Sequence, residues 1–376
     1  MLNIPQELTD KIIDCLHDDK PSLYLVCWAW VPATRFHIFA DITLRRSWSR
    51  MMHPQYRPFV DMLATDSCTF APFVVSLTLE DLDQTLEAEL EISPLFTTLA
   101  KLKTVKALTF RRLGSLGEQP LYSFLPRLPS LTEISLQSVK LASADQLFTI
   151  LEMCPSLTSL KLVSVSWELS TASAVYARRT SIRKLSIIGC PPHEFFYAFA
   201  PAHSSSRLTC TSLAIQSIVS ADVENIVGLL NCTSETLVHL LLGFDGWDDD
   251  VEGLFFVHMD LANHKRLVSL RICDIQANDE PKLERLLTMI HNALRAPLLE
   301  VLELVLMCST RSVMEEIPWG RIDNLISSLH PDSLRHVAFS FRGLYISDDT
   351  RAATVVDIMR QLRKCSASDF EVVITL

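Results

Sequence analysis

The chain has 376 residues, enough to form one large domain or two modest ones around a sizeable hydrophobic core. Its 34 Lys and Arg against 44 Asp and Glu give a net charge of −10, which argues against a protein that tracks nucleic-acid phosphates. Mean hydropathy is +0.23, but the longest clean apolar run near the start, Leu23–Val31, is far short of the ~20 residues of a membrane-spanning helix.

The start of the chain and the cysteines indicate the compartment. No basic segment followed by an apolar one opens the sequence, so we expect no secretory signal. The chain has 10 cysteines, which without such a signal are expected to be reduced thiols. We therefore predict a cytoplasmic or nuclear protein, or one present in both, with no membrane partner.

The first predicted elements are two short apolar helices within residues 3–30. Apolar residues fall at helical spacing on two stripes: Leu8, Ile12 and Leu16, then Leu23, Val26 and Trp30. Pro5 suits a first helical turn. Two such helices have too little apolar surface to fold alone, so we expect them to gain stability by packing against another structure.

From residue 73 onward, a pattern L-x-x-L-x-L recurs ten times, with Val, Ile, Phe or Cys also allowed at the L positions. Its middle apolar residue falls at 77, 108, 134, 160, 185, 213, 240, 270, 302 and 337, in steps of 25 to 35 residues. Residues two apart point to one face of a strand, so each pattern predicts a strand with one buried face. Phe39, Ile42 and Leu44 repeat the spacing and predict an earlier strand. A period of this length indicates a solenoid.

Helical patterns occupy the stretches between these strands. Ser143 with Gln146 and the later Ser220 each predict a helix N-cap before an apolar stripe. Prolines at 129, 155 and 297 stand two residues before a strand pattern, where a helix must end. Alternating strands and helices predict parallel strands joined by helices on one side.

These repeats resemble leucine-rich repeats of the ribonuclease-inhibitor-like or cysteine-containing kind. The closest stretches are "CPSLTSLKLVSV" (154–165) and "SIRKLSIIGC" (181–190). The resemblance implies an α/β fold: a leucine-rich-repeat solenoid of about ten irregular repeats over residues 73–376, with a curved parallel sheet and outer helices. A doubly wound α/β domain is the alternative, although it rarely shows ten near-equal repeats or lacks a Gly-rich turn.

Residues 4–44 resemble an F-box, a short all-α motif, on the strength of Ile4-Pro5, "LVCWAW" (25–30) and "ATRFHIFADITL" (33–44). The resemblance, closest to fungal F-box proteins with leucine-rich repeats, implies an F-box at 1–44, a connecting segment at 45–72, and docking to the Skp-type adaptor of a cullin–RING ubiquitin ligase. The implied adaptor-binding residues are Ile4, Pro5, Leu8, Ile12, Ile13, Leu16, Leu23, Leu25, Val26 and Trp30.

One departure from the F-box pattern leaves a second interpretation open. Only residues 20–24 separate Asp19 from Leu25, roughly one helical turn fewer than in comparable family members. The helices at 1–44 are therefore either a shortened F-box or an N-terminal cap that covers the first repeat, since solenoid ends need capping.

No motif predicts catalysis or a cofactor. The nine glycines form no G-x-G-x-x-G, G-x-S-x-G or P-loop. "HEFFY" (193–197) lacks the second histidine of a zinc protease, no two cysteines have zinc-site spacing, and "DGWDDD" (245–250) lacks calcium-loop spacing. We expect neither an enzyme nor a metal site.

A target is expected to bind the concave face of the solenoid, on residues between the buried positions. The predicted target-binding residues are Arg111, Lys161, Lys184, Ile188, His239, Leu241 and Arg271. Their basic members predict a mildly basic face that captures an acidic or phosphorylated segment. The alternative is that these are scattered surface residues.

The resemblances together imply the substrate-recognition subunit of a Skp–cullin–F-box ubiquitin ligase. Such a subunit holds an unidentified protein target near a ubiquitin-charged enzyme and does no chemistry itself. The alternative is a non-ligase leucine-rich-repeat binding module whose F-box remnant serves as a cap. An α/β enzyme, the third class, has no supporting motif.

Overall fold

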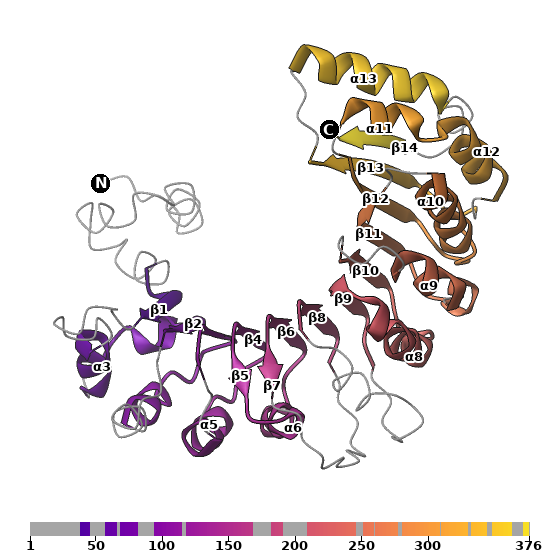
Figure 1. The fold of residues 1–376 in the computed structure, drawn as a ribbon. Coiled ribbons are helices and arrows are strands. Elements are labelled where there is room, and N and C mark those ends of the chain that lie inside the picture. Colours follow the sequence, from indigo (N-terminus) through magenta and orange to yellow (C-terminus); the bar gives the residue numbers. More distant parts are fainter. Residues whose placement is uncertain are drawn as a thin grey trace, which may run out of the picture. The chain divides into compact units, whose positions relative to one another are not determined.

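The structure, a computed structural model of the 376-residue chain, forms two compact units, Met1–Ser173 and Ala174–Leu376, which we call unit 1 and unit 2 (Figure 1). It describes residues 38–45, 57–65, 68–81, 94–114, 118–167, 182–190, 209–245, 251–258, 260–276, 280–308, 310–329, 332–343, 348–362 and 371–375. The predicted adaptor-binding residues, Ile4 to Trp30, lie outside these ranges.

Unit 1 alternates strands with helices and short 3₁₀ turns. Its elements are β1 (Asp41–Arg45), α3 (Arg57–Ala64), η3 (Ala71–Phe73), β2 (Ser76–Glu80), β3 (Ala107–Arg111), α5 (Glu118–Phe124), η4 (Leu125–Arg127), β4 (Glu133–Gln137), β5 (Lys140–Leu141), α6 (Ala144–Met153), β6 (Ser159–Val163) and β7 (Ser166–Trp167). Strands β1, β2, β3, β4 and β6 pair in that order, all parallel, and β5 pairs with β7 in a separate small sheet.

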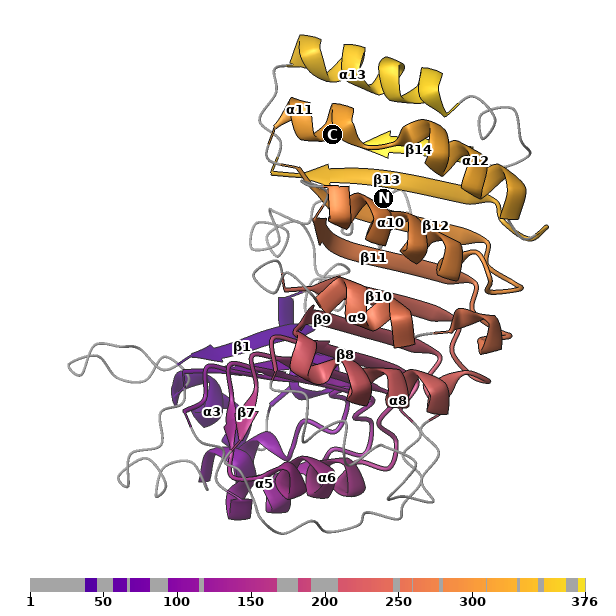
Figure 2. The same ribbon diagram turned by 45° about the vertical axis from the view of Figure 1, so that its right-hand side comes forward.

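Unit 2 continues the alternation with longer strands. Its elements are β8 (Lys184–Ile188), β9 (Ser212–Ile218), η5 (Ser220–Asp222), α8 (Val223–Thr233), β10 (His239–Phe244), α9 (Val251–His258), η6 (Leu261–Asn263), β11 (Ser269–Gln276), α10 (Glu280–Ala293), β12 (Val301–Met307), α11 (Arg311–Glu316), α12 (Trp319–Leu329), β13 (His336–Arg342), α13 (Asp348–Gln361) and β14 (Glu371–Thr375). Each strand pairs in parallel with the next in the chain. Helices α8, α9, α10 and α12 run along one side of these strands (Figure 2).

The predicted strand positions are confirmed. Each of the ten middle apolar residues, from Leu77 to Val337, is the second residue of its strand. The earlier strand predicted from Ile42 and Leu44 is β1. Consecutive strand order within each unit differs from a doubly wound domain, whose strand order reverses at a switch point. The described strands and helices therefore form the α/β repeats of a leucine-rich-repeat-like fold.

A repeated backbone hydrogen bond aligns each strand start with the next. The carbonyl of the residue before the strand accepts two N–H groups from the following repeat; the Lys106 carbonyl, for example, accepts from Thr132 and Glu133 at 2.9 Å each. The Thr211 carbonyl accepts in the same way from Val238 and His239, also at 2.9 Å. Within each unit this shared arrangement sets a common register at the strand starts, so equivalent side chains there lie side by side on neighbouring strands.

A left-handed turn follows five of the five-residue strands, β2, β3, β4, β6 and β8. Asp81, Arg112, Ser138 and Ser164, which follow β2, β3, β4 and β6, have φ between 50° and 56°, and Gly189 after β8 has φ 57°. In unit 1, the N–H of this turn residue donates across to the next strand, as from Ser138 to the Val163 carbonyl at 2.8 Å. The turn directs the chain away from the sheet and toward the layer of helices.

One predicted helix cap is confirmed and one is wrong. The Ser143 side chain accepts a hydrogen bond from the Gln146 N–H and caps α6. Ser220 instead lies inside η5, and α8 begins only at Val223, because a 3₁₀ turn precedes the helix. The apolar stripe predicted for α8 is nevertheless buried.

The sheet extends into the segment predicted as an F-box. Strand β1 occupies residues 41–45 and pairs with β2 along its full length. In the following segment, α3 buries Leu63 completely, and the Phe59 ring packs 5.1 Å from that of Phe70. The two units also divide the stretch predicted as a single repeat domain, 73–376.

Candidate functional site

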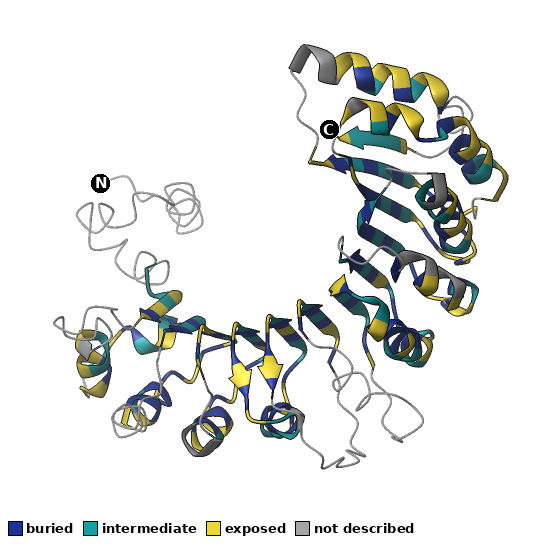
Figure 3. Cartoon of the chain, viewed as in Figure 1, coloured by how far each residue is buried: buried dark blue, intermediate teal, exposed yellow. Residues whose placement is uncertain are grey.

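Each unit presents an open sheet face, which we define as the side away from the helices. In every strand from β2 to β13 that has five or more residues, the second and fourth residues are buried and the first and third are not (Figure 3). The buried positions form the core beneath the helices. Side chains at the first, third and, in most strands, fifth positions therefore face solvent in ordered rows.

The open face of unit 1 is polarised along its strands. Asp41 and Glu133, at the first positions, make the amino ends acidic. Arg45, Arg111 and the turn residue Arg112 bring positive charge to the carboxyl ends. An acidic and a basic edge thus lie on one face of one unit.

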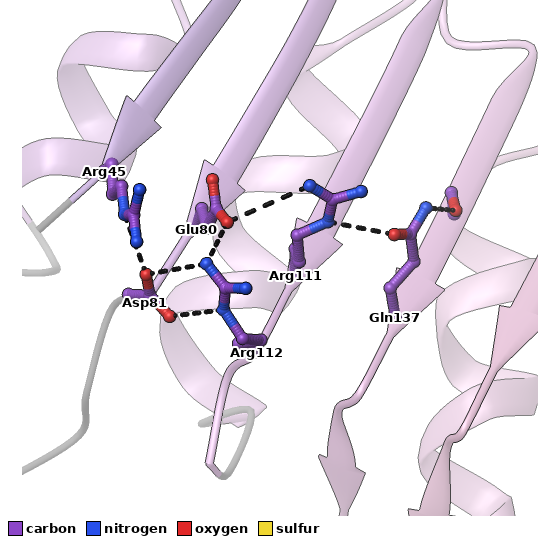
Figure 4. A network of polar contacts seen from close by, with 7 residues as sticks. Arg45, Glu80, Asp81, Arg111, Arg112 and Gln137 are labelled. Carbon is purple, nitrogen blue, oxygen red and sulfur yellow. Dashed lines mark hydrogen bonds and ion pairs between the residues drawn. The ribbon is translucent and has the colours of Figure 1, made fainter.

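At the basic edge, seven side chains from β1 to β4 form a chain of polar contacts, which we call the arginine network (Figure 4). Its members are Arg45, Glu80, Asp81, Arg111, Arg112, Gln137 and Ser135. They come from consecutive strands because the shared register brings the strand ends side by side.

Arg112 is the centre of this network. Its Nε donates to Asp81 Oδ1 at 2.8 Å and its Nη2 to Asp81 Oδ2 at 3.1 Å, and the same Nη2 also contacts Glu80. Arg45 Nε donates to Asp81 Oδ2 at 3.0 Å from the other side. One carboxylate is therefore bound by two guanidinium groups, a geometry that favours charge-assisted hydrogen bonds.

Arg111 extends the network toward β4. Its Nε donates to Gln137 Oε1 at 3.0 Å, and its Nη1 lies 3.9 Å from Glu80 Oε1. The Gln137 amide nitrogen in turn donates to the Ser135 hydroxyl at 3.1 Å. Lys161 is the strand partner of Ser135, so this predicted target-binding residue lies beside the end of the network.

The two carboxylates are nearly buried, whereas the three arginines are not. The Glu80 and Asp81 side chains are 10% and 8% exposed, against 46% for Arg111 and Arg112 and 50% for Arg45. Hydrogen bonds from Arg112, together with its charge and that of Arg45, hold the pKa of Asp81 below its ordinary value of 3.8. Asp81 is therefore held as an anion, and the contacts of both side chains orient the arginines.

In unit 2 the predicted target-binding residues fall at different strand positions. Lys184 and His239 are exposed first residues of β8 and β10, separated by β9. Leu241 and Arg271 are directly paired third residues of β10 and β11. Ile188 lies apart from them, at the fifth position of β8.

Ion pairs balance the charges in unit 2 as well. Arg271 Nε lies 3.4 Å from Glu303 Oε2 on the next strand, and Arg342 lies 3.5 Å from Asp274.

At the carboxyl end of β10, side chains pack closely over Gly243: a Cβ there would lie 3.2 Å from Gln216 and 3.4 Å from Asp274. Any larger residue would displace these side chains.

Charged residues of both signs share the open faces on which the sequence predicted a mildly basic surface. At the first, third and fifth positions, unit 1 has three basic and three acidic residues, and unit 2 has two of each. The set is Arg45, Arg111, Lys161, Lys184 and Arg271 against Asp41, Glu80, Glu133, Glu303 and Glu371. Arg111 and Lys161 lie in unit 1 and the other five predicted residues in unit 2.

Sequence reasoning missed Arg45, Asp81 and Arg112. The last two lie one residue beyond the strand, in the left-handed turn, and so fall outside a strictly alternating pattern. A signal was present: "LTLED" (77–81) and "LTFRR" (108–112) align with opposite charges at the same two positions. Opposite charges at equivalent positions of adjacent strands indicate a cross-strand ionic network.

Five of the described thiols are buried: Cys154, Cys190, Cys210, Cys273 and Cys308. Burial raises the pKa of Cys154 to about 12 and those of Cys210 and Cys308 to about 11, so all three are protonated at neutral pH. Among the described residues, no group of three His, Cys, Asp or Glu side chains is placed to hold a metal ion. No helix in the described part is long and apolar enough to span a membrane.

Comparisons with known proteins add little to this geometry. No family model matches the chain. No curated protein matches it either. Among solved structures, 37 chains match, including one described as the crystal structure of a TLR13–ssRNA13 complex, with 14% identity and a TM-score of 0.39, covering 81% of this chain and 39% of that one. At this level of similarity the match supports no argument, so the fold assignment rests on strand order and register.

Proposed function

We propose that the chain is a protein-binding repeat module and that the open sheet face is its binding surface. The observation behind the proposal is the set of ordered rows in each unit: along the strands, solvent-facing side chains alternate with a buried leucine-rich core. The core holds the backbone in place while the exposed residues vary in chemistry. Such a surface suits recognition of an extended protein partner.

We further propose that the module is the substrate receptor of a Skp–cullin–F-box ubiquitin ligase. This part rests on the F-box-like residues of the stretch 4–44, in particular the apolar stripes that include Leu8, Ile12 and Trp30. Helices with outward apolar stripes gain stability by packing on a partner. In this role the chain supplies proximity between a target and the ligase.

Affinity purification with mass spectrometry tests both parts together. The wild-type chain should recover a Skp-type adaptor, a cullin and at least one further protein. Changing Leu8, Ile12 and Trp30 together to Asp should remove the adaptor and keep the target, with circular dichroism confirming that the repeats remain folded. A target recovered by the wild type without any adaptor would contradict the ligase role. It would favour a non-ligase module, the alternative suggested by the short spacing after Asp19.

Charge reversal tests the binding surface. Changing Lys161, Lys184 and Arg271 together to Glu should abolish target capture, because it inverts the charge of basic residues on the open faces of both units. The matched control reverses three exposed basic residues outside the strands: Arg127, Lys265 and Arg266. The control should capture targets as the wild type does. Equal capture by both triple variants would contradict the assignment of the open face.

A further inference from the structure

We propose that the arginine network of unit 1 is a subsite that binds an acidic side chain, Asp or Glu, of the bound protein. This inference deepens the proposed binding function and rests on it. The network lies at the carboxyl ends of β1 to β4, on the open face, where an extended partner would pass. Three observations support it: unused donors, an excess positive charge and a pre-organised geometry.

Each arginine retains donors that no described residue uses. Among the described residues, Arg45 binds Asp81 through Nε, and neither of its terminal nitrogens has a partner there. Arg112 uses Nε and Nη2, which leaves Nη1, and Arg111 uses Nε and Nη1, which leaves Nη2. Because each side chain is 46% to 50% exposed, these donors can reach a ligand. A carboxylate accepts two parallel N–H groups from a guanidinium.

The network has more positive charge than its own structure requires. Arg112 alone binds both oxygens of Asp81 and also contacts Glu80, so it serves both carboxylates. Arg45 and Arg111 therefore exceed what the two carboxylates need. Three arginines against two acids leave the network with one net positive charge. One carboxylate neutralises that charge, whereas a phosphomonoester, at about −1.5 to −2, would exceed it. The charge therefore favours an unmodified acidic residue.

The arginines are held in place before a ligand arrives. Nearly buried Glu80 and Asp81 fix the guanidinium planes, which reduces the side-chain entropy lost on binding. Arg112 also adopts φ 52°, in the left-handed region, where the other described residues are Asp, Ser and Gly. A side chain with a Cβ is strained in this region of the backbone. The turn directs the Arg112 side chain back onto the network that Arg111 also joins.

The test measures binding of fluorescein-labelled peptides to the full chain by fluorescence anisotropy. One peptide has a central run of glutamates, its twin has glutamines, and a third has a central phosphoserine. The glutamate peptide should bind more tightly than the glutamine twin, even though the protein has a net charge of −10. Arg111→Gln and Arg45→Gln should each weaken glutamate-peptide binding about five- to tenfold. Arg127→Gln, which changes an exposed arginine of unit 1 outside the strands, should leave it within about twofold.

Both test variants keep the bidentate pair of Arg112 with Asp81, and circular dichroism checks that they fold. Equal binding of the glutamate and glutamine peptides, or equal effects of Arg111→Gln and Arg127→Gln, would overturn the proposal. Tighter binding of the phosphoserine peptide would overturn the carboxylate assignment. Full capture of cellular targets by the Arg111→Gln variant would contradict the subsite but not the proposed binding function. Failure of the wild-type chain to capture any target would contradict the binding function.

Discussion

Asp81 shows how one residue can serve both backbone and electrostatics. Its left-handed φ of 56° ends β2, and its nearly buried carboxylate binds Arg45 and Arg112. Aspartate tolerates this backbone region better than most residues. The residue therefore closes a turn and fixes two arginines at the same time.

Replacing Asp81 by Asn isolates the charge, because Asn keeps the shape and also tolerates the left-handed region. We expect Asp81→Asn to lower the free energy of unfolding by about 1 kcal/mol, since the paired arginines are half exposed. Urea denaturation measures the change. The pKa of Asp81 is lowered in the folded state, so its contribution is complete above 3.8 and is lost as the pH falls below that value. The difference between variant and wild type should therefore shrink in acid.

Asp357→Asn is the control, because Asp357 forms an exposed ion pair within helix α13. That change should alter stability by less than about 0.5 kcal/mol. Equal effects of the two substitutions would show that the Asp81 network adds nothing to stability.

The buried His264 side chain should make the stability of the fold depend on pH in a second range, above that of Asp81. It is fully buried before β11, and its Nε2 lies 3.2 Å from the Leu230 carbonyl at the end of α8. Burial lowers the pKa of His264 below its ordinary value of 6.5. The unfolded chain therefore binds the proton more tightly, and stability should fall as the pH drops below 6.5, by at most about 1.4 kcal/mol per pH unit.

Urea denaturation across this pH range measures the effect, and His264→Gln should flatten the profile. His258→Gln, at an exposed position of α9, should keep the wild-type slope. An unchanged slope in the His264 variant would show that another group is responsible.

At the scale of elements, neighbouring residues on one strand have opposite roles. Leu240 is 2% exposed and faces the helices, whereas Leu241 faces the open side and pairs with Arg271. We expect Leu240→Ala to lower the free energy of unfolding by about 2–4 kcal/mol and Leu241→Ala by less than about 1 kcal/mol. Thermal or urea unfolding distinguishes them. A larger loss from Leu241→Ala would reverse the assigned faces of β10.

The strands could be predicted because their physical signal is strong. Apolar residues at fixed offsets locate β2, β3 and the strands that follow, since each must fill the same core. β14 was missed because Asp369 stands where the first apolar residue of the pattern would be. The cap of α8 was misplaced because a serine signal does not distinguish a 3₁₀ turn from the first turn of an α-helix.

The binding surface was harder to predict than the strands. Alternation identified Arg111 and Lys161 as outward-facing residues, but not their partners. Arg112 and Asp81 reach the network through a left-handed turn, which a count of alternating positions does not include. Charge balance also depends on register: Arg271 is paired with Glu303 only because β11 and β12 align in one way.

At the scale of the whole molecule, our proposal assigns target binding and ligase docking to different parts of the chain. Each unit buries a leucine-rich core and leaves one sheet face open. In our proposal, those faces hold a target, and the F-box-like residues of the stretch 4–44 connect that target to a ligase. The arginine network belongs to unit 1 alone, so its contribution can be tested without changing unit 2.

Site-specific photo-crosslinking in cells tests the central claim, that the open sheet face is the binding surface. A benzoylphenylalanine placed at Leu241, on the open face of β10, should crosslink to a target protein identified by mass spectrometry. The same group at Leu254, an exposed position on helix α9, should give no crosslink to that target. Crosslinks to the target from Leu254 and none from Leu241 would contradict the account.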